Sequence, residues 1–232
     1  QVLDPNDPVT IGAMVGPEAF TEVRYLAHAK QLQALDLLPE LAVEFQQVFG
    51  RNSGGLIKPY HLEDAETVVI ALGSVLGTIK DTVDEMRAQG VKIGVLGITS
   101  FRPFPIEAIR AVTAHAKRIV VIEKCFAVGI GGIVSRDVRS AVQSRPQQVF
   151  AVVAGLGGRA ITKASLHKLL LQAIEDKLEL LTFLDLDWGI VNRVLEREKQ
   201  QRRSGPVAEG ILRDIGTVSR EAPATALNRS ER

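Results

Sequence analysis

Short runs of aliphatic and β-branched residues alternate with helix-length segments through the middle of the chain, and this alternation constrains the fold most. Continuous apolar runs, without polar residues at alternate positions, are typical of strands that are covered on both faces. Strands separated by helices of about ten to twelve residues indicate a mainly parallel sheet. Four strands are expected, at residues 67–72, 91–98, 119–123 and 149–153. The pattern predicts a three-layer α/β domain over residues 64–160.

Helices are expected between these strands. The first is predicted over residues 78–89, because Thr78 and Asp81 resemble a capping box in which Asp replaces the usual Glu or Gln. The second is predicted over residues 105–116, since proline is tolerated in the first turn of a helix. The third is expected to end near Gln143.

The sequence changes character on either side of this domain. Residues 1–16 are expected to form an extended arm, because proline disfavours helix at the residue before it. Residues 17–63 are expected to be a helical linker region, which Pro39 should kink or split. Residues 161–203 are predicted to hold C-terminal helices. Residues 204–232 are poor in aromatic residues and are expected to be a disordered tail.

Charge and cysteine content exclude several classes of function. Lys and Arg number 28 against 27 Asp and Glu, so no strong field favours nucleic acid or an anionic membrane as a partner. No apolar run approaches the roughly 20 residues of a membrane helix, and a cytoplasmic location is expected. The single cysteine excludes a disulfide framework, an iron–sulfur cluster held by this chain alone and a Cys-rich zinc site. Cys125 is expected to pack as a small hydrophobic residue. The chain opens with Gln1, so we expect a piece of a longer polypeptide.

One candidate binding element follows the first predicted strand. Gly73, Ser74, Gly77 and Thr78 end a strand and open a helix, where backbone N–H groups can receive a phosphate or carboxylate. No Lys-Ser/Thr pair follows the second glycine, so the element is not a P-loop. The alternative is a plain tight turn with a helix cap.

Two glycine-rich segments follow later strands. They contain Gly131 and Gly132, and Gly157, Gly158 and Arg159. The carboxyl ends of parallel strands are where open α/β sheets keep their functional surface, so both segments are candidate anion or interface sites. The alternative is that the glycines serve close packing of helix and sheet.

A stiff connection carries a third candidate. Arg102 lies between two aromatic residues and is followed by Pro103, Phe104 and Pro105. Such a loop could present the guanidinium to an anion or to a facing subunit. Alternatively, Arg102 stacks on Phe101 or Phe104 and pins the loop. No set of nucleophile, base and acid can be named from the spacing, so no catalytic residue and no metal ligand is predicted.

Taken together, these motifs resemble the C-terminal portion of the α subunit of pyruvate:ferredoxin and related 2-oxoacid:ferredoxin oxidoreductases. The resemblance runs from residue 1 to about residue 163. Its residues are Leu3, Asp4, Pro5, Pro8, Val9, Thr10 and Gly12; Leu72, Gly73, Ser74, Gly77 and Thr78; Arg87, Gly90, Val91 and Gly94; Phe101 to Pro105; and Gly155 to Arg159. The sequence departs from the family pattern at Glu123 and Lys124, where Asp-Arg is usual, and at Ala160, where an acidic residue is common.

The resemblance implies a fold similar to the C-terminal domain of transketolases, with a five-stranded, mostly parallel sheet whose fifth strand comes from the resemblance alone. It also implies that the chain is part of an enzyme that converts a 2-oxo acid to acyl-CoA by oxidative decarboxylation, or that catalyses the reverse reaction. The expected 2-oxo acid is pyruvate. The whole enzyme would use thiamine diphosphate, Mg, iron–sulfur clusters and CoA.

Within that enzyme, this chain is expected to be a non-catalytic structural and interface domain that binds none of the cofactors by itself. Its expected partners are the missing N-terminal half of the α subunit, a thiamine-binding β subunit, an iron–sulfur subunit and, through the complex, ferredoxin. Contacts with a second copy of the chain are also expected. Two alternatives remain open, namely the C-terminal domain of another thiamine enzyme and a free-standing α/β module that binds a small anion.

Overall fold

The computed structural model describes residues 4–6, 12, 14–200, 210–212 and 215–216. Most of the expected arm at 1–16 and nearly all of the expected tail at 204–232 therefore lie outside the described residues. Within the described part of the chain, no helix is long and apolar enough to cross a membrane.

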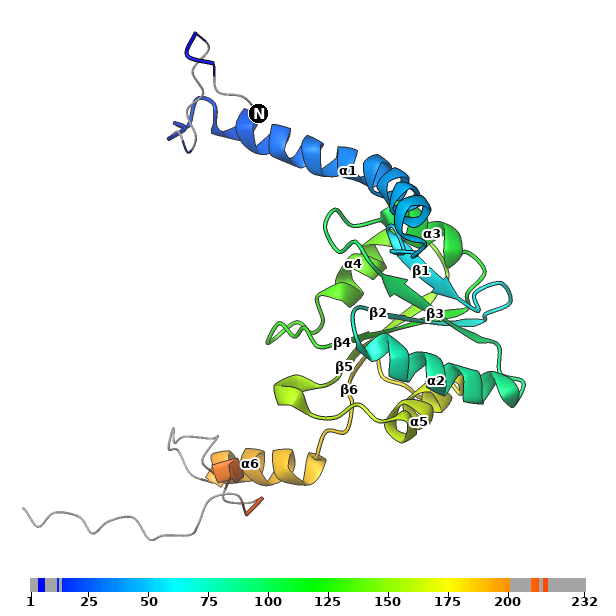
Figure 1. Ribbon diagram of the computed structural model, residues 1–232. Helices are drawn as coiled ribbons and strands as arrows, with labels where there is room; N and C mark the ends of the chain where they lie inside the picture. The colour runs from blue at the N-terminus through cyan, green and yellow to red at the C-terminus, as the bar shows by residue number, and fades with distance from the viewer. Residues whose placement is uncertain (1–3, 7–11, 13, 201–209, 213–214, 217–232) are drawn as a thin grey trace, which may run out of the picture. The chain divides into compact units, whose positions relative to one another are not determined.

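A six-stranded sheet forms the centre of the first compact unit, Gln1–Leu184 (Figure 1). The strands lie side by side in the order β1-β3-β2-β4-β5-β6, with β1 antiparallel to β3 and every other neighbouring pair parallel. Their bounds are β1 Ile57–Tyr60, β2 Thr67–Ala71, β3 Ile93–Ile98, β4 Arg118–Glu123, β5 Gln148–Val153 and β6 Leu181–Phe183.

The predicted α/β class with a mostly parallel sheet is confirmed, but the sheet has six strands and not the five that were expected. Strands β2 to β5 correspond to the four strands expected from the sequence. The two edge strands were not predicted from the apolar pattern, because β1 and β6 are short and only partly buried. Their positions correct two expectations: β1 lies in the region 17–63 that was expected to be helical, and β6 lies in the region 161–203. The boundary expected at residue 160 thus falls inside the sheet-bearing unit.

Helices cover both faces of the sheet (Figure 1). Along β2, Val69 and Ala71 point into one buried cluster while Val68 and Ile70 point into the other. The first cluster contains side chains of α2 and α5, and the second contains side chains of α3 and α4. The helix bounds are α2 Val75–Ala88, α3 Ile106–Val112, α4 Val134–Ala141 and α5 Lys163–Ile174.

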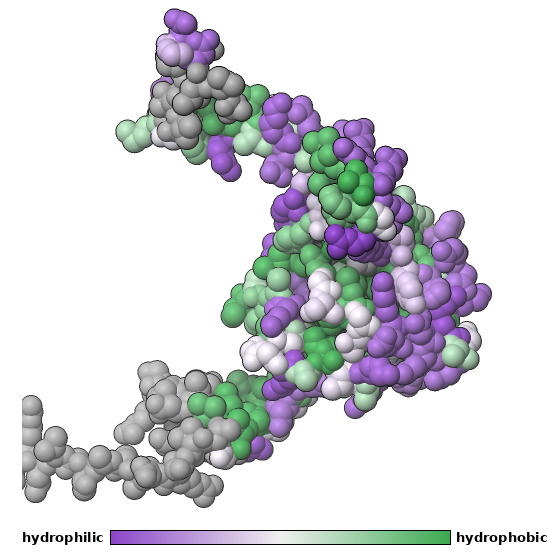
Figure 2. All heavy atoms as spheres, in the orientation of Figure 1, coloured by the Kyte–Doolittle hydropathy of each residue, from purple (hydrophilic) through white to green (hydrophobic). Residues whose placement is uncertain are grey.

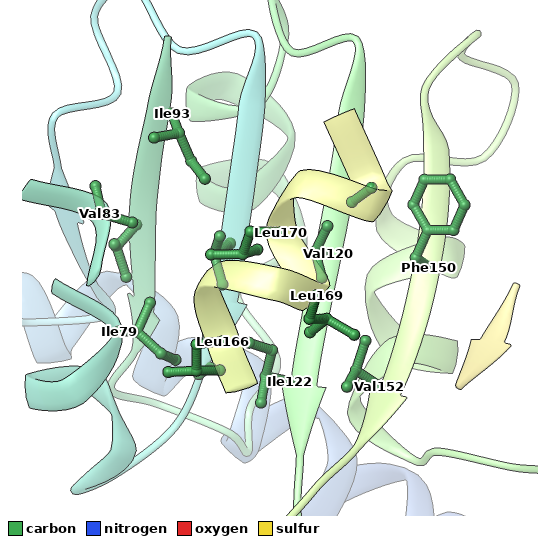
Figure 3. Close-up of a cluster of buried hydrophobic side chains, with 14 of the residues drawn as sticks. Ile79, Val83, Ile93, Val120, Ile122, Phe150, Val152, Leu166, Leu169 and Leu170 are labelled. Atoms are coloured by element: carbon green, nitrogen blue, oxygen red, sulfur yellow. The ribbon is translucent and has the colours of Figure 1, made fainter. Parts of the chain in front are cut away.

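The packing of α5 shows why the domain extends past residue 160. Figure 3 shows Leu166 and Leu169 of α5 lying against Ile122 of β4 and Val152 of β5. Complete burial of one aliphatic side chain contributes about 1.5–3 kcal/mol, so α5 is part of the core. The Thr162 hydroxyl starts α5 by accepting a hydrogen bond from the Ser165 N–H at 3.1 Å.

The start of α2 differs from the prediction. The helix begins at Val75, three residues before the expected capping box, and no side chain in the described structure caps its first turn. Thr78 lies inside the helix, where its carbonyl oxygen accepts a hydrogen bond from the Thr82 hydroxyl at 2.8 Å. The capping-box prediction is therefore wrong, because Gly73 at φ +77° already lets the chain turn directly from β2 into the helix.

Two further helices flank the sheet in the sequence. α1 spans Phe20–Phe49 and is not split at Pro39; none of its described residues is buried. The Leu35 carbonyl, which loses its N–H partner to Pro39, can therefore be hydrated. α6, Trp188–Gln200, belongs to the second compact unit, where the Asp187 carboxylate accepts a hydrogen bond from the Ile190 N–H at 3.0 Å.

Ion pairs hold the amino ends of the central strands. Just before β2, Asp64 pairs with Arg87 at 2.9 Å, and Glu66 pairs with Lys117 at 2.7 Å and with Lys92 at 3.7 Å. The hydrogen bond from Arg87 lowers the pKa of Asp64, and the hydrogen bond from Lys117 lowers the pKa of Glu66. Both carboxylates are partly exposed, so water screens these pairs and their individual contributions to stability are small.

We expect the substitution Lys117→Met to raise the pKa of Glu66 toward its ordinary value. Because a lowered pKa in the folded state favours folding above the ordinary pKa, the wild type should be more stable than this variant near neutral pH. The difference should disappear as the pH falls through the folded-state pKa of Glu66. Carboxyl chemical shifts and urea unfolding at several pH values measure both effects. Lys168→Met is the matched control, and an equal stability difference at every pH would contradict the expectation.

Candidate functional site

A cavity of about 490 Å³ lies at the carboxyl ends of β2, β4 and β5. The chain passes from β2 to β3 on one side and then returns to place β4 on the other side of β2. The connections after β2 and β4 therefore leave toward opposite faces of the sheet, which is where open α/β sheets form ligand-binding crevices. The volume lies in the usual range for small-molecule sites, roughly 300–1,000 Å³.

Polar groups from three connections line the cavity. Ser74 and Thr78 come from the start of α2, Lys124 and Cys125 follow β4, and Arg159 follows β5. The walls between them are mostly apolar and include Leu72, Val75, Phe101, Ile122 and Ile161. The cavity therefore combines an apolar body with hydroxyl groups and two cations.

The buried carboxylate of Glu123 fixes one wall. Glu123 is the last residue of β4 and is only 5% exposed. One carboxylate oxygen accepts hydrogen bonds from the N–H groups of Ile133 and Val134, both at 2.7 Å, and the other accepts one from Ser135 at 2.9 Å. Because these are otherwise unpartnered N–H groups of the first turn of α4, the carboxylate caps that helix and its charge interacts with the helix dipole.

Gly132 makes this approach of carboxylate and helix possible. A methyl group added at Gly132 would overlap the Glu123 carboxylate and the Ser135 hydroxyl. Gly131, at φ +107°, adopts a conformation that residues with a side chain rarely adopt. Both glycines thus serve the fold of the β4–α4 connection rather than the lining of the cavity.

Between Glu123 and α4 the chain forms a small hairpin. Ala127 pairs with Gly131, with the Ala127 N–H donating to the Gly131 carbonyl at 2.8 Å and the Gly131 N–H donating back at 2.9 Å. The hairpin leaves Val128 88% exposed and Ile130 62% exposed. Exposed apolar side chains at the tip of a hydrogen-bonded hairpin are typical of a surface that contacts another molecule.

The β5–α5 connection is also rich in glycine. Gly155, Gly157 and Gly158 all have positive φ, at +74°, +65° and +84°, so the segment turns tightly around the end of β5. This turn brings Gly158 and Arg159 to the cavity, whereas Gly157 is not among the lining residues.

The Arg102 loop is held within the domain. The guanidinium lies 4.1 Å from the centre of the Phe101 ring and donates to Asp137 of α4 at 2.8 Å. Pro103 and Pro105 are buried and Phe104 is half-buried. The expected stacking of Arg102 is thus confirmed, while its contact with a facing subunit stays a prediction.

The structure brings some predicted site residues together and separates others. Ser74, Thr78, Gly158 and Arg159 meet at the cavity. The remaining candidates do not line it; they are Gly73, Gly77, Arg102, Pro103, Phe104, Pro105, Gly131, Gly132 and Gly157.

Three residues after the β4 apolar run were not predicted to form part of the site, namely Glu123, Lys124 and Cys125. Cys125 was expected to pack as a small hydrophobic residue, but it is exposed, because the sheet ends at Glu123 and the chain leaves the covered layer there. The sequence feature that could have indicated these residues is the carboxylate of Glu123 at the end of an otherwise apolar strand.

The cationic and hydroxyl groups that line the cavity are of the kind that an anionic ligand needs. No group of three or more His, Cys, Asp or Glu side chains that could hold a metal ion occurs within the described ranges. Among those residues, Cys125 also has no hydrogen-bonded base beside it.

We expect Glu123→Ala to lower the free energy of unfolding by about 3 kcal/mol, because it leaves three N–H groups of α4 without their acceptor. Glu123→Gln should lower it by less, since one acceptor oxygen remains while the amide NH₂ faces N–H donors. Glu107→Gln is the matched control, because Glu107 is an exposed carboxylate in an i,i+3 pair and should contribute under about 1 kcal/mol. Urea unfolding measures all three. A loss no larger than that of the control would show that the cap is unimportant.

Comparison with known proteins agrees with the resemblance seen in the sequence. Residues 65–166 match the family model of pyruvate:ferredoxin oxidoreductase core domain II. Pyruvate synthase subunit PorA of Methanosarcina barkeri is 42% identical over 73% of this chain and 43% of its own length. The same subunit of Pyrococcus horikoshii is 37% identical over 76% of this chain and 45% of its own. Ketoisovalerate oxidoreductase subunit VorA of that organism is 33% identical over 68% and 41%.

Solved structures with low similarity were also found. A 2-oxoglutarate:ferredoxin oxidoreductase from Magnetococcus marinus is 18% identical, with a TM-score of 0.41 over 59% of this chain and 21% of its own. A split-gene transketolase is 18% identical, with a TM-score of 0.39 over 50% of this chain and 40% of its own.

The chain spans less than half the length of the curated relatives that it matches. Two of these relatives are named as pyruvate synthase subunits and one as a ketoisovalerate oxidoreductase subunit. The resemblance is confirmed: the chain is related to subunits of 2-oxoacid:ferredoxin oxidoreductases, and residues 65–166 are similar to core domain II of the pyruvate enzyme.

Proposed function

We propose that this chain supplies core domain II to a multi-subunit pyruvate:ferredoxin oxidoreductase and acts there as a structural and interface domain. The observation that carries the proposal is the match of residues 65–166 to that domain, in a chain that is 42% identical to a pyruvate synthase subunit. The enzyme would oxidatively decarboxylate pyruvate with CoA to acetyl-CoA and pass the electrons to ferredoxin, or catalyse the reverse reaction.

We infer that this chain does not hold the cofactors of such an enzyme by itself. Thiamine diphosphate and iron–sulfur clusters would supply the bond-breaking and electron-transfer chemistry, while protein residues bind and orient. An iron–sulfur cluster usually takes four thiolates, and this chain has one cysteine. The described residues also lack a group of three or more possible metal ligands. We therefore place both cofactors, and the Mg that accompanies thiamine diphosphate, on other parts of the complex.

Exposed apolar surface supports an interface role. Figure 2 shows apolar side chains on the surface of α1 among polar ones. Several large apolar side chains on this helix are at least 44% exposed; they are Phe20, Val23, Tyr25, Leu26, Leu32, Leu37, Leu41, Val43, Val48 and Phe49. The β4–α4 hairpin adds Val128 and Ile130. Clustered exposed apolar groups of this kind mark protein–protein contacts.

We assign these surfaces to the remainder of the α subunit and to the thiamine-binding and iron–sulfur subunits, with contacts to a second copy of the chain also expected. A cytoplasmic location and delivery of electrons to ferredoxin through the complex stay predictions.

One observation supports an alternative substrate for the enzyme. A ketoisovalerate oxidoreductase subunit is 33% identical over 68% of the chain, not far below the pyruvate synthase relatives. A branched 2-oxo acid is therefore the alternative to pyruvate.

The proposal is tested by tagging this chain in its native organism and purifying what accompanies it. We expect cysteine-rich and thiamine-binding subunits to co-purify, and the complex to reduce a viologen dye with pyruvate and CoA. Faster reduction with ketoisovalerate would identify the alternative substrate. Isolation of the chain without such partners would contradict the proposal, as would binding of thiamine diphosphate to the isolated chain at about 1 μM, which corresponds to about −8.2 kcal/mol.

We also expect Leu26→Asp with Leu37→Asp to weaken assembly while leaving the melting temperature of the isolated chain unchanged. The reason is that both side chains are exposed and α1 places none of its described residues in the core. Size-exclusion chromatography with light scattering measures the assembly. Gln33→Asp, which changes a polar position of the same helix, is the matched control, and assembly equal to that control would exclude α1 as the interface.

A further inference from the structure

We propose that the cavity at the carboxyl ends of β2, β4 and β5 is a binding site for a small organic anion, with a phosphate or carboxylate held by Lys124 and Arg159 and an apolar body held by the cavity walls. The inference goes beyond the proposed function, which gives this domain no ligand, and it does not depend on which 2-oxo acid the enzyme uses.

Charge is the first argument. Two cations, Lys124 and Arg159, line the cavity, and Glu123 is the only acidic residue in its lining. Both oxygens of Glu123 are occupied by N–H groups of α4, so the carboxylate is directed into the helix cap and its charge is offset there. Among the residues that line the cavity, the cationic side chains therefore outnumber the carboxylates, which suits an anionic ligand.

Unused hydrogen-bonding groups are the second argument. Within the described part of the chain, the Lys124 ammonium has no ion pair, and the Ser74 and Thr78 hydroxyls have no side-chain partner. The cavity at the carboxyl ends thus offers donors that a ligand can use.

The apolar walls of the cavity indicate that the ligand has an apolar body beside its anionic group. Phe101, Val75 and Ile161 contribute to an apolar enclosure. A free inorganic ion would leave this surface exposed to water, whereas an anion with an apolar body would cover it and gain about 25 cal/mol for each Å² buried. A few polar groups that converge on an otherwise apolar cavity are the usual pattern of a small-molecule site.

Cys125 provides the measurement, because it is the single cysteine of the chain and lines the cavity. The rate at which iodoacetamide alkylates Cys125 is followed by mass spectrometry on the full chain. The probes are phenyl phosphate and phenylacetate, which share a ring and differ in the anionic group. Inorganic phosphate and acetate test the anionic group alone, and benzyl alcohol is the neutral control.

We expect one of the two aromatic anions to slow alkylation, by about tenfold at a concentration ten times its Kd, because only the free fraction of the sites reacts. Protection by phenyl phosphate alone would identify a phosphate ligand, and protection by phenylacetate alone a carboxylate. The headgroup-only anions should protect at much higher concentration. The result that overturns the proposal is absence of protection by either aromatic anion, or equal protection by benzyl alcohol.

Variants then locate the site. Lys124→Gln and Arg159→Gln should each raise the protecting concentration at least about tenfold, which corresponds to about 1.4 kcal/mol. Thr78→Val should raise it by less. Lys177→Gln is the matched control, because Lys177 is an exposed lysine whose ion pair with Glu175 lies outside the cavity lining. Protection that survives in both Lys124→Gln and Arg159→Gln would show that the anion binds elsewhere.

Discussion

The hydrogen bonds between the Glu123 carboxylate and the first turn of α4 determine the shape of the functional edge of the sheet. They fix the place where β4 ends and the place where α4 begins, and they require a glycine at position 132. The segment between the end of β4 and the start of α4 therefore leaves the sheet. It forms the exposed hairpin and places Lys124 and Cys125 at the cavity. One buried carboxylate, satisfied by three donors, thus links strand, helix and cavity.

The two edges of the sheet are built by different interactions. At the amino ends of the strands, oppositely charged side chains from separate elements meet, as in Arg87 with Asp64 and Arg118 with Asp176. Such pairs tie helices to strands, and each of these carboxylates has a cationic partner. At the carboxyl ends, glycine-containing connections turn sharply, and the Lys124 ammonium has no carboxylate partner among the described residues. The sheet therefore has one edge where the carboxylates are held in ion pairs and one edge that is suited to ligands.

The sequence allowed the buried strands to be predicted but not the edge strands or the site as a whole. All residues from Val68 to Ala71 are apolar because both faces of β2 are covered, and this pattern can be recognised in the sequence alone. β1 and β6 are half-exposed and short, so their pairing depends on neighbours distant in sequence. Glycine-rich turns at strand ends led to the prediction of Ser74, Thr78 and Arg159. The role of Glu123 could not be predicted in this way, because it depends on the position of α4, which the local sequence does not indicate.

The charge of Lys124 distinguishes a ligand-binding edge from a purely apolar interface. Exposed side chains such as Val128 gain free energy when a partner covers them, but an ammonium group that loses water without gaining an anion costs free energy. Whatever covers this edge must therefore bring negative charge to the end of β4. A macromolecular partner would have to bring a carboxylate to the Lys124 ammonium. A small organic anion needs no such insertion, because a cavity of about 490 Å³ already gives it access to both cations and to the apolar wall beside Phe101.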